Sequence, residues 1–301
     1  MRKLLKKIIP EKQRRQLNQL EQKVKGAVKG AQATALNKLL SDKVKVGLKS
    51  SLQVIARLDY DKCDIFLNID SDIEYSTRLH SCKKEPEMIR WIETILKPGD
   101  VLYDIGANVG AYTLVAAKYH QAKVKIYAFE PSFLNFVKLS KNILTNHTQG
   151  CVTPMQIALS DETTLGTFNY NNLTPGGAMH AFGQAVDYKG DAFVPVYQQE
   201  VFSYTMDDLI KRFKIPVPNH IKMDVDGIEF KILKGATETL EYPSLKSIII
   251  ELDEGDEESS RTVQFLKERG LEYRSKHKYT AADDTGPFSK MYNYIFERVR
   301  R

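Results

Sequence analysis

Residues 101–119, VLYDIGANVGAYTLVAAKY, constrain the fold more than any other part of the chain. The run from Val101 to Ile105 is apolar or aromatic around a single acid, which predicts a buried strand. The run from Leu114 to Ala117 predicts a helix that packs against this strand. Two glycines and an asparagine lie between them, so the connection is a sharp turn whose backbone another molecule can approach closely. A dinucleotide, a phosphate group, a methyl donor, or no ligand at all, is compatible with such a turn.

Apolar segments of strand length and helix length alternate after this turn. Such alternation is typical of βαβ units and predicts an α/β fold, with a doubly wound, mostly parallel sheet and helices on both faces. Residues 161–204, rich in glycine and asparagine, interrupt the alternation, and we interpret them as an insertion or lid at the ligand-binding edge of the sheet. The predicted strands are 101–107, 125–130, 151–159, 220–226, 247–252 and 290–298, and the predicted helices are 111–120, 133–146, 228–240 and 257–269.

The sequence divides into three parts. Residues 1–50 contain 14 Lys and Arg against 3 Asp and Glu, whereas the rest of the chain contains 30 and 35, so a basic arm precedes a mildly acidic body. Residues 51–98 predict an N-terminal β/α extension, with two short strands in residues 52–70 and a helix after them. Residues 99–301 are predicted to form the main α/β domain.

The basic arm is predicted to be an amphipathic helix, since apolar residues recur at spacings of three and four among lysines and arginines. Such a helix could lie on anionic lipid, pair with a partner, or pack on its own domain. Nucleic acid binding is not expected, because the arm contains no aromatic residue and no base-reading motif accompanies it. The apolar positions are Leu4, Leu5, Ile8, Ile9, Leu17, Leu20, Val24, Ala27 and Ala31.

Three features of the sequence indicate a cytoplasmic protein, with the arm at the inner face of the membrane if it binds lipid. No apolar run has the length needed to span a bilayer. The N-terminus lacks the apolar core and the cleavage site of a secretory signal. The three cysteines form no C-x-x-C pair, which fits a reducing compartment and makes a structural zinc site unexpected.

The residues around the turn favour a methyl donor over a dinucleotide. Glu130 ends the next strand twenty positions after Gly110, where a carboxylate suits a ribose diol. Nicotinamide enzymes and S-adenosylmethionine enzymes share this feature, but here the turn follows Asp104 and has the order G-x-N-x-G instead of G-x-G-x-x-G. A sulfonium donor has no pyrophosphate that needs the extra glycine, and an acid suits its cationic ammonium and sulfonium groups.

Six motifs occur in the order DIGANVG, FEP, ALSD, TMDDL, IKMDVDGIE and IIIELDE. From about Leu52 to the end, the chain therefore resembles the FkbM-type methyltransferases. The resemblance implies an S-adenosylmethionine-dependent O-methyltransferase of the seven-stranded class I, Rossmann-like fold, acting on a sugar, glycan, polyketide or related metabolite. It also implies the cofactor-binding residues: Asp104, Gly106, Asn108 and Gly110 at the methionine portion, Thr113 at its carboxylate, Glu130 at the ribose, and Ser160 and Asp161 beside the adenine.

Charged residues on a strand predicted to be buried indicate a catalytic group. In HIKMDVDGIEF, Lys222 and Asp224 alternate with apolar residues, and burying such charges without partners on a central strand is costly. Methyl transfer to a hydroxyl needs alignment and help in removing the proton. We predict Asp224 as the base or orienting group with Lys222 as its balancing charge. His180 is the second candidate base, and a solvent-exposed loop histidine is its alternative.

Two further groups of polar residues have more than one interpretation. Asp226 and Glu229 have the spacing of a helix capping box, and with Asp224 and Glu251 they could also offer oxygen ligands to magnesium, so a divalent metal is left unassigned. Two alternatives to a methyltransferase remain: a nicotinamide oxidoreductase, and a non-catalytic binding module on the same fold.

Four basic residues suit a phosphorylated, nucleotide-linked or carboxylated acceptor, or are ordinary surface charge: Arg78, His80, Lys83 and Lys84.

If residues 1–40 form a membrane-binding helix, their deletion will abolish binding to anionic vesicles and leave methyl transfer to a soluble acceptor intact. Each basic residue near an anionic surface contributes about 1 kcal/mol, and exposed charges are screened beyond roughly 8–10 Å in physiological buffer. Binding of the full chain should therefore weaken as salt rises, which vesicle co-sedimentation will measure. A deletion that changes the oligomeric state, with no vesicle binding by either form, would identify an assembly helix instead.

Overall fold

The chain forms two compact units, Met1–Gln53 and Val54–Arg301. The structure, a computed structural model, describes residues 30–31, 34–35, 37–278 and 289–299. In the first unit, helix α3 (Asp42–Ser51) buries none of its residues. The predicted amphipathic helix of the arm falls mainly outside the described residues and stays a prediction. Among the helices that are described, none combines the length and the apolar character needed to cross a membrane.

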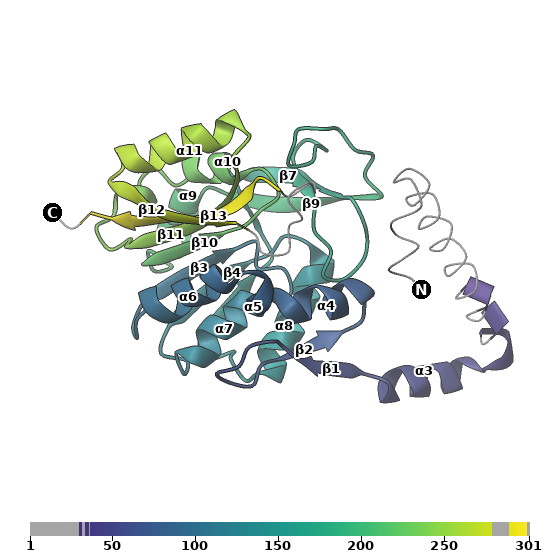
Figure 1. Ribbon diagram of the computed structural model, residues 1–301. Helices are drawn as coiled ribbons and strands as arrows, with labels where there is room; N and C mark the ends of the chain where they lie inside the picture. Colours follow the sequence, from purple (N-terminus) through teal and green to yellow (C-terminus); the bar gives the residue numbers. More distant parts are fainter. Residues whose placement is uncertain (1–29, 32–33, 36, 279–288, 300–301) are drawn as a thin grey trace, which may run out of the picture. The chain divides into compact units, whose positions relative to one another are not determined.

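A seven-stranded sheet forms the centre of the second unit (Figure 1). Its strand order is β12-β13-β11-β10-β3-β4-β5, and the strands from β11 to β5 are parallel, whereas β13 is antiparallel to both neighbours. This confirms the predicted α/β fold with a mostly parallel sheet. The strands are β3 (Val101–Ile105), β4 (Lys125–Phe129), β5 (Val152–Met155), β10 (His220–Met223), β11 (Ser247–Asp253), β12 (Leu271–Lys278) and β13 (Met291–Arg298).

Helices cover both faces of this sheet, because its central strands are apolar on both sides (Figure 1). Leu102 and Ile126 belong to one core with α6, α7 and α8, whereas Ile221 and Met223 belong to a second core with α9, α10 and α11. From β3 the chain adds β4 and β5 on one side, and it later adds β10 on the other side. The strand order therefore reverses at β3. Ligands bind at such a switch point, beyond the carboxyl ends of the strands. The helices are α6 (Pro86–Ile95), α7 (Ala111–Tyr119), α8 (Phe133–Thr145), α9 (Met206–Phe213), α10 (Glu229–Lys234) and α11 (Glu257–Glu268).

The extension before β3 begins with an antiparallel hairpin of β1 (Val54–Arg57) and β2 (Phe66–Ile69), which matches the two strands predicted in residues 52–70. Side-chain amides of α8 and of the residue that follows it bind this hairpin. Asn142 Oδ1 accepts from the backbone N–H of Asn68 at 2.7 Å, and Asn146 Oδ1 accepts from that of Phe66 at 2.8 Å. The short helices α4 (Asp72–Ser76), η1 (Arg78–His80) and α5 (Ser81–Lys84) then lead to α6.

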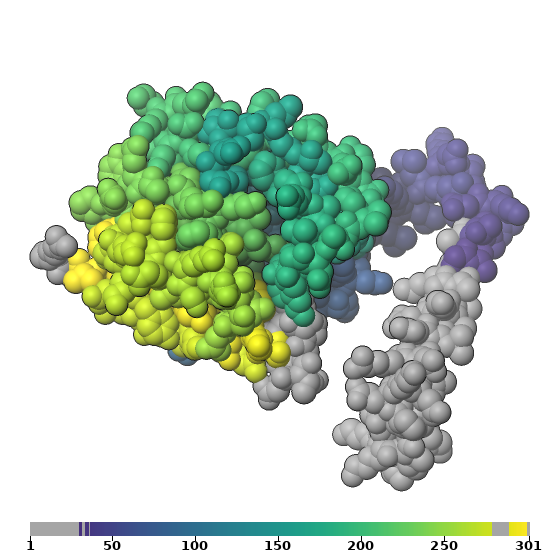
Figure 2. All heavy atoms as spheres, turned by 90° about the horizontal axis from the view of Figure 1, so that it is seen from above, coloured from purple at the N-terminus to yellow at the C-terminus, as the bar shows by residue number. Residues whose placement is uncertain are grey.

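The insertion folds into a second sheet of order β6-β9-β7-β8. Its strands are β6 (Ala158–Leu159), β7 (Thr164–Tyr170), β8 (Ala181–Phe182) and β9 (Tyr197–Tyr204). Phe168 and Tyr170 pack with Phe133 at the start of α8, so the small sheet lies over the carboxyl ends of the main strands. The insertion lies beside α11 (Figure 2). Tyr188 of the insertion and Ser259 of α11 line one hollow.

Most predicted elements agree with the structure to within two residues, but three differ. Predicted strand 151–159 is divided between β5 and β6, which belong to different sheets. Predicted strand 220–226 is shorter in the structure, where β10 ends at Met223. Predicted helix 228–240 is interrupted: α10 ends at Lys234, and a short 3-10 helix, η2 (Thr239–Glu241), follows it. Strand β12 was not predicted, because its sequence LEYRSKHK is mostly polar and it lies at the edge of the sheet.

A buried Asp–His–Ser arrangement lies at the amino-terminal ends of the parallel strands. His220 Nε2 lies 3.0 Å from Asp100 Oδ2, and its Nδ1 lies 2.8 Å from Ser247 Oγ. His220 and Ser247 are fully buried, which denies a substrate access and makes the network structural. Burial lowers the pKa of His220 to about 4, and this outweighs the attraction of Asp100 for the imidazolium.

Acid should remove the stability that His220 contributes. In the unfolded chain His220 has its ordinary pKa and takes up a proton first. Its contribution is therefore fully present above pH 6.5, falls steadily as the pH drops below 6.5, and is lost by about pH 4. The advantage of the wild type over His220→Gln in free energy of unfolding should shrink by about 2–3 kcal/mol between pH 7 and 4.5. Urea unfolding at both pH values measures this. The exposed His147, changed to Asn, should show no such change, and a constant difference for His220→Gln would refute the assignment.

Candidate active site

The turn after β3 depends on left-handed backbone at three residues. Gly106 has a φ of 74°, Asn108 of 50° and Gly110 of 89°. A Cβ on Gly106 would lie 2.0 Å from the backbone oxygen of Asp224, and a Cβ on Gly110 would lie 2.6 Å from Leu139. Only glycine therefore lets the turn approach the end of β10 and the side of α8 so closely.

A buried ammonium group joins the ends of β3 and β10. Lys222 pairs with Asp104 in the register of the two parallel strands, so both side chains lie on the same face of the sheet. Lys222 Nζ lies 3.1 Å from Asp104 Oδ1 and 3.6 Å from Asp224 Oδ2, and it donates to the backbone oxygen of Gly106 at 2.9 Å. Burial disfavours the cation, but the two carboxylates outweigh this cost and raise the pKa of Lys222.

Two residues predicted at the methionine portion of a cofactor are instead enclosed in this network. Asp104 is almost fully buried, and Thr113 is fully buried at the start of α7. The hydroxyl of Thr113 donates to Asp104 Oδ2. Neither side chain lines the pocket at the carboxyl ends of these strands, so both support the turn from behind.

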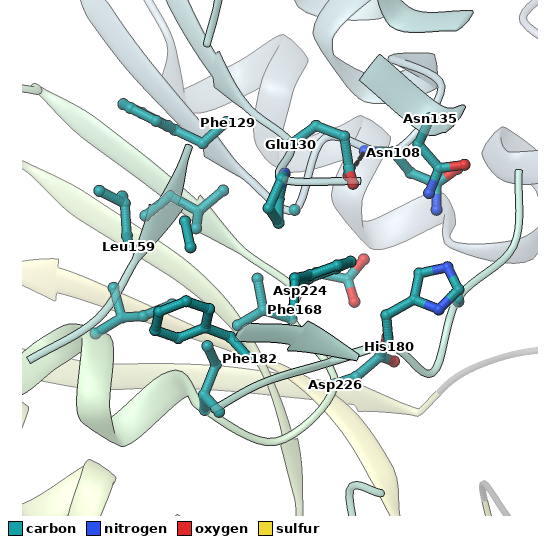
Figure 3. Close-up of a pocket in the computed structure, with 18 of the residues that line it drawn as sticks. Asn108, Phe129, Glu130, Asn135, Leu159, Phe168, His180, Phe182, Asp224 and Asp226 are labelled. Atoms are coloured by element: carbon teal, nitrogen blue, oxygen red, sulfur yellow. Dashed lines mark hydrogen bonds between the residues drawn. The ribbon is translucent and has the colours of Figure 1, made fainter. Parts of the chain in front are cut away.

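A pocket lies at the carboxyl ends of β3, β4 and β10, between the main sheet and the insertion (Figure 3). One end is apolar and is lined by Phe129, Ala158, Leu159, Phe168, Phe182, Ile228 and Ile232. The other end is polar and is lined by Arg78, Asn108, Glu130, Asn135, His180, Asp224 and Asp226. An apolar slot leading to convergent polar groups is the usual form of a small-molecule site.

Glu130 lies at the junction of the two ends. Its Oε2 accepts from the backbone N–H of Asn108 at 2.8 Å, and its Oε1 accepts from that of Ser132 at 3.0 Å. Burial raises the pKa of Glu130 to about 7, although both hydrogen bonds act in the opposite direction. The Asn108 side chain in turn donates to the backbone oxygen of Gly177 at 2.9 Å and so connects the turn to the insertion.

Asp224 is a partly exposed charged group beside the turn, with 33% of its side chain exposed. Burial opposes its ionisation, but the charges of Lys222, Lys84 and Arg78 outweigh this and lower the pKa of Asp224. A carboxylate that is ionised, partly exposed and directed into a pocket can accept a proton from a bound hydroxyl.

Asp226 does not cap helix α10, and the capping-box interpretation is wrong. The residue before the helix is Ile228, and it makes no side-chain cap. The carboxylate of Asp226 instead accepts from the backbone N–H of Met179, in the insertion, at 2.6 Å. Burial, and then the charge of Asp224, raise the pKa of Asp226 to about 6. Glu229 retains half of the expected pattern, since its carboxylate accepts long hydrogen bonds from backbone N–H groups before the helix.

His180 lines the pocket from the insertion, where its ring packs against Phe168 and Tyr170. The backbone N–H of Asn171 donates to its Nδ1 at 3.3 Å, which leaves the proton of the neutral ring on Nε2. Burial lowers the pKa of His180 to about 4. A histidine with this pKa and an occupied Nδ1 is a weak proton acceptor at neutral pH, so the geometry favours Asp224 as the base.

Ser160 and Asp161, expected beside an adenine, do not line the pocket. Ser160 Oγ donates to Asp161 Oδ1 at 3.1 Å, and Asp161 Oδ2 pairs with Lys234 of α10 at 2.8 Å. A Cβ on Gly235 would lie 2.1 Å from the backbone oxygen of Ser160, so this segment holds the end of α10 against β6. The neighbouring Ala158 and Leu159 line the apolar end instead.

Many residues of the pocket were not predicted as site residues, among them Asn135, Phe168 and Phe182. Asn135 follows the FEP motif closely, and this proximity is the signal that could have identified it. Phe168 and Phe182 meet only because β7 and β8 pair in that register, which no local pattern reveals. Of the four basic residues expected near an acceptor, only Arg78 lines the pocket. Lys84 forms an ion pair with Glu85 at 3.0 Å, and the side chains of His80 and Lys83 are exposed.

The magnesium ligands that spacing suggested do not converge as a set. Within the described residues, no group of three or more histidine, cysteine, aspartate or glutamate side chains is arranged to hold a metal ion. Asp224 is bound to Lys222, and Asp226 to Met179. Glu229 and Glu251 line a second hollow, which Asp226 borders as well, and burial raises the pKa of Glu229 to about 8.

Comparisons with known proteins define the family. The model of the Methyltransferase FkbM domain matches residues 104–273, more than half of the chain. The chain therefore belongs to the FkbM methyltransferase family and is an S-adenosylmethionine-dependent methyltransferase, which removes the oxidoreductase and the non-catalytic module as alternatives.

Similar proteins include two curated methyltransferases. The hexuronic acid methyltransferase AglP of Haloferax volcanii is 26% identical over 183 residues, which are 61% of this chain and 68% of that protein. The 31-O-demethyl-FK506 methyltransferase FkbM of Streptomyces tacrolimicus is 26% identical over 196 residues, which are 58% of this chain and 74% of that protein. The solved structure of M. jannaschii TYW2 in complex with AdoMet shares 15% identity and a TM-score of 0.43, covering 82% of this chain and 87% of that one.

Proposed function

We propose that the chain transfers the methyl group of S-adenosylmethionine to a hydroxyl oxygen of a sugar acceptor. The acceptor is a hexuronic acid or a related sugar metabolite. The observation behind this proposal is Asp224, an ionised and partly exposed carboxylate at the polar end of the pocket, beside the glycine turn. The names of two similar proteins, a hexuronic acid methyltransferase and a 31-O-demethyl-FK506 methyltransferase, support an oxygen-bearing metabolite as the acceptor.

The pocket has the shape and chemistry that the cofactor requires. When bound, S-adenosylmethionine supplies an electrophilic methyl group on a sulfonium sulfur. We assign the adenine to the apolar end, between Leu159 and the two phenylalanines of the insertion, and the ribose diol to Glu130. The turn at Gly106 and Asn108, and Asp224 beside it, would hold the methionine portion, because all three residues line the pocket.

The remaining predicted residues act behind this surface. Asp104 and Thr113 fix Lys222, and Lys222 in turn holds the carbonyl of Gly106 and the carboxylate of Asp224. Asp224 would orient the acceptor hydroxyl and remove its proton, because a sugar hydroxyl is a poor nucleophile until it is deprotonated. Lys222 keeps Asp224 ionised for this role.

The assignment of Glu130 predicts a pH-dependent loss of cofactor affinity. Glu130→Gln should weaken the binding of S-adenosylhomocysteine by roughly 1.5–3 kcal/mol, the contribution of a hydrogen bond to a charged group. Wild-type affinity should also fall as the pH drops below about 7, because protonation removes an acceptor, and the variant should lack this dependence. Isothermal titration calorimetry measures both effects. The exposed Glu162, changed to Gln, is the control, and an unchanged affinity in folded Glu130→Gln would remove the ribose from Glu130.

The assignment of Asp224 predicts a loss of turnover with the fold preserved. Asp224→Asn keeps the size of the side chain and removes its charge, so kcat at saturating cofactor should fall by about a hundredfold or more. Steady-state kinetics on a responsive acceptor measure this, with the exposed Asp61→Asn as the matched control. Near-normal turnover would assign proton removal to another group.

The acceptor can be identified by the stability of the transferred label. Incubation with radiolabelled S-adenosylmethionine and either glucuronic acid, a glucuronic-acid-containing oligosaccharide or glucose tests the class of sugar. A methyl ether on a hydroxyl survives mild base, whereas a methyl ester on the carboxylate is hydrolysed. Base-stable label on a uronic acid supports the proposal, and label only on an ester or on no sugar would contradict it.

A further inference from the structure

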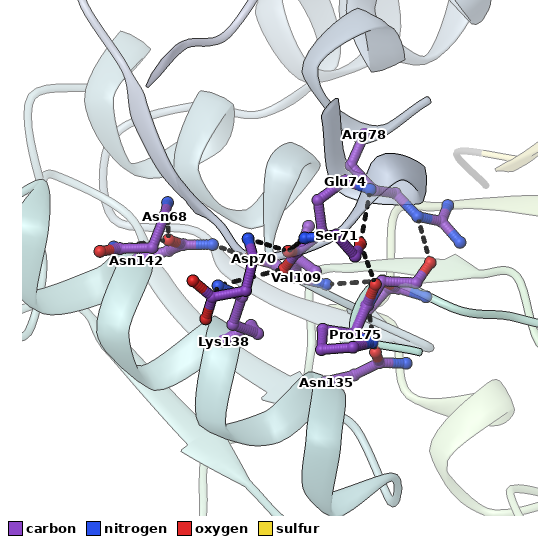
Figure 4. A network of polar contacts seen from close by, with 12 residues as sticks. Asn68, Asp70, Ser71, Glu74, Arg78, Val109, Asn135, Lys138, Asn142 and Pro175 are labelled. Atoms are coloured by element: carbon purple, nitrogen blue, oxygen red, sulfur yellow. Dashed lines mark hydrogen bonds and ion pairs between the residues drawn. The ribbon is translucent and has the colours of Figure 1, made fainter. Parts of the chain in front are cut away.

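The guanidinium group of Arg78 faces the polar end of the pocket without a carboxylate partner. Its Nε donates to the backbone oxygen of Gly176 at 2.9 Å. Its terminal nitrogens make no hydrogen bond or ion pair with the described residues, as the free end of the side chain in Figure 4 illustrates. Arg78 is also the only lysine or arginine among the described residues that line the pocket.

Polar contacts hold the segment that carries Arg78 in place (Figure 4). Helix α4 begins with a capping box in which Ser71 and Glu74 exchange hydrogen bonds, and the buried Lys138 lies 3.4 Å from Glu74. The hydroxyl of Ser71 donates to the backbone oxygen of Pro175 at 2.7 Å. A Cβ on Gly176 would lie 2.8 Å from Glu74, so the insertion packs directly against α4.

The loop that fixes Arg78 is itself bound to the core beneath it. Asn135 Oδ1 accepts from the backbone N–H of Gly176 at 2.9 Å, and its amide donates to the backbone oxygen of Gly177 at 3.0 Å. The side chain of Asn108 donates to the same oxygen of Gly177. The position of the Nε of Arg78 is therefore set by the cofactor turn and by α8, and the fork of terminal nitrogens is oriented in advance.

The charges of the pocket indicate what this fork would bind. Glu130, Asp224 and Asp226 all line the polar end, so a ligand carboxylate placed there would be repelled without a compensating cation. A planar guanidinium with two free nitrogens matches the two oxygens of a carboxylate, which an ammonium group cannot do.

We propose that Arg78 binds a ligand carboxylate through both terminal nitrogens. This inference rests on the proposed function, since two of its reactants carry a carboxylate. One is the amino-acid tail of the cofactor, and the other is a uronic acid acceptor. Binding of either would place the remaining part of that ligand beside Asp224.

Calorimetry on Arg78→Ala and Arg78→Lys distinguishes the two sources. If the cofactor tail is bound, Arg78→Ala weakens S-adenosylhomocysteine by about tenfold or more and leaves 5′-methylthioadenosine, which lacks the tail, unchanged. If the acceptor is bound, the variant keeps its affinity for S-adenosylhomocysteine. The protein loaded with S-adenosylhomocysteine then loses its preference for glucuronate over glucose. Arg78→Lys should recover only part of either loss, because it keeps the charge without the fork.

The exposed Arg90, changed to Ala, is the control for loss of a positive charge from the same extension. The proposal is overturned if Arg78→Ala binds every ligand as the wild type does. It is also overturned if the variant loses 5′-methylthioadenosine as strongly as S-adenosylhomocysteine, since that pattern indicates a damaged pocket. A wild type that binds no S-adenosylhomocysteine would refute the proposed function instead, so the two failures are separable.

Discussion

The active site depends on the buried ammonium group of Lys222. A cation in this position is stable only because Asp104 pairs with it across the strand register and Asp224 lies on its other side. Its hydrogen bond to the carbonyl of Gly106 ties the ends of β3 and β10 together where the turn must stay open. Removing Asp104 would leave the buried charge with Asp224, 3.6 Å away, as its one carboxylate partner among the described residues, which would damage the turn and the ionisation of Asp224 together.

The pocket is completed by contacts that cross between distant parts of the chain. Asn108 of the turn holds the backbone of Gly177, and Asp226 beyond β10 holds that of Met179. The insertion is therefore fastened to the same two strand ends that Lys222 joins. Polar groups at the end of a buried strand therefore need not all be catalytic, because some of them hold the insertion in position across the pocket.

The sequence revealed the features that local geometry determines. The glycine turn, the carboxylate at Glu130 and the alternation of strands and helices follow from backbone sterics and apolar periodicity, and they agree with the structure. The sequence did not reveal which acids are accessible. Asp104 looked like a ligand group because it precedes the turn, but the register places it against Lys222. Pocket residues such as Phe182 depend on pairing within the insertion, which spacing along the chain does not determine.

The balance of charge in the pocket suits a cationic reactant better than its product. Asp224 is ionised at neutral pH, whereas burial raises the pKa of Asp226 to about 6 and that of Glu130 to about 7. A bound sulfonium would stabilise the ionised forms of these acids, and they would stabilise it, because opposite charges attract strongly where water is excluded. Transfer of the methyl group leaves a neutral sulfur and ends this attraction. If these carboxylates bind the donor as proposed, they would bind the demethylated product less tightly, which favours exchange of one for the other after each turnover.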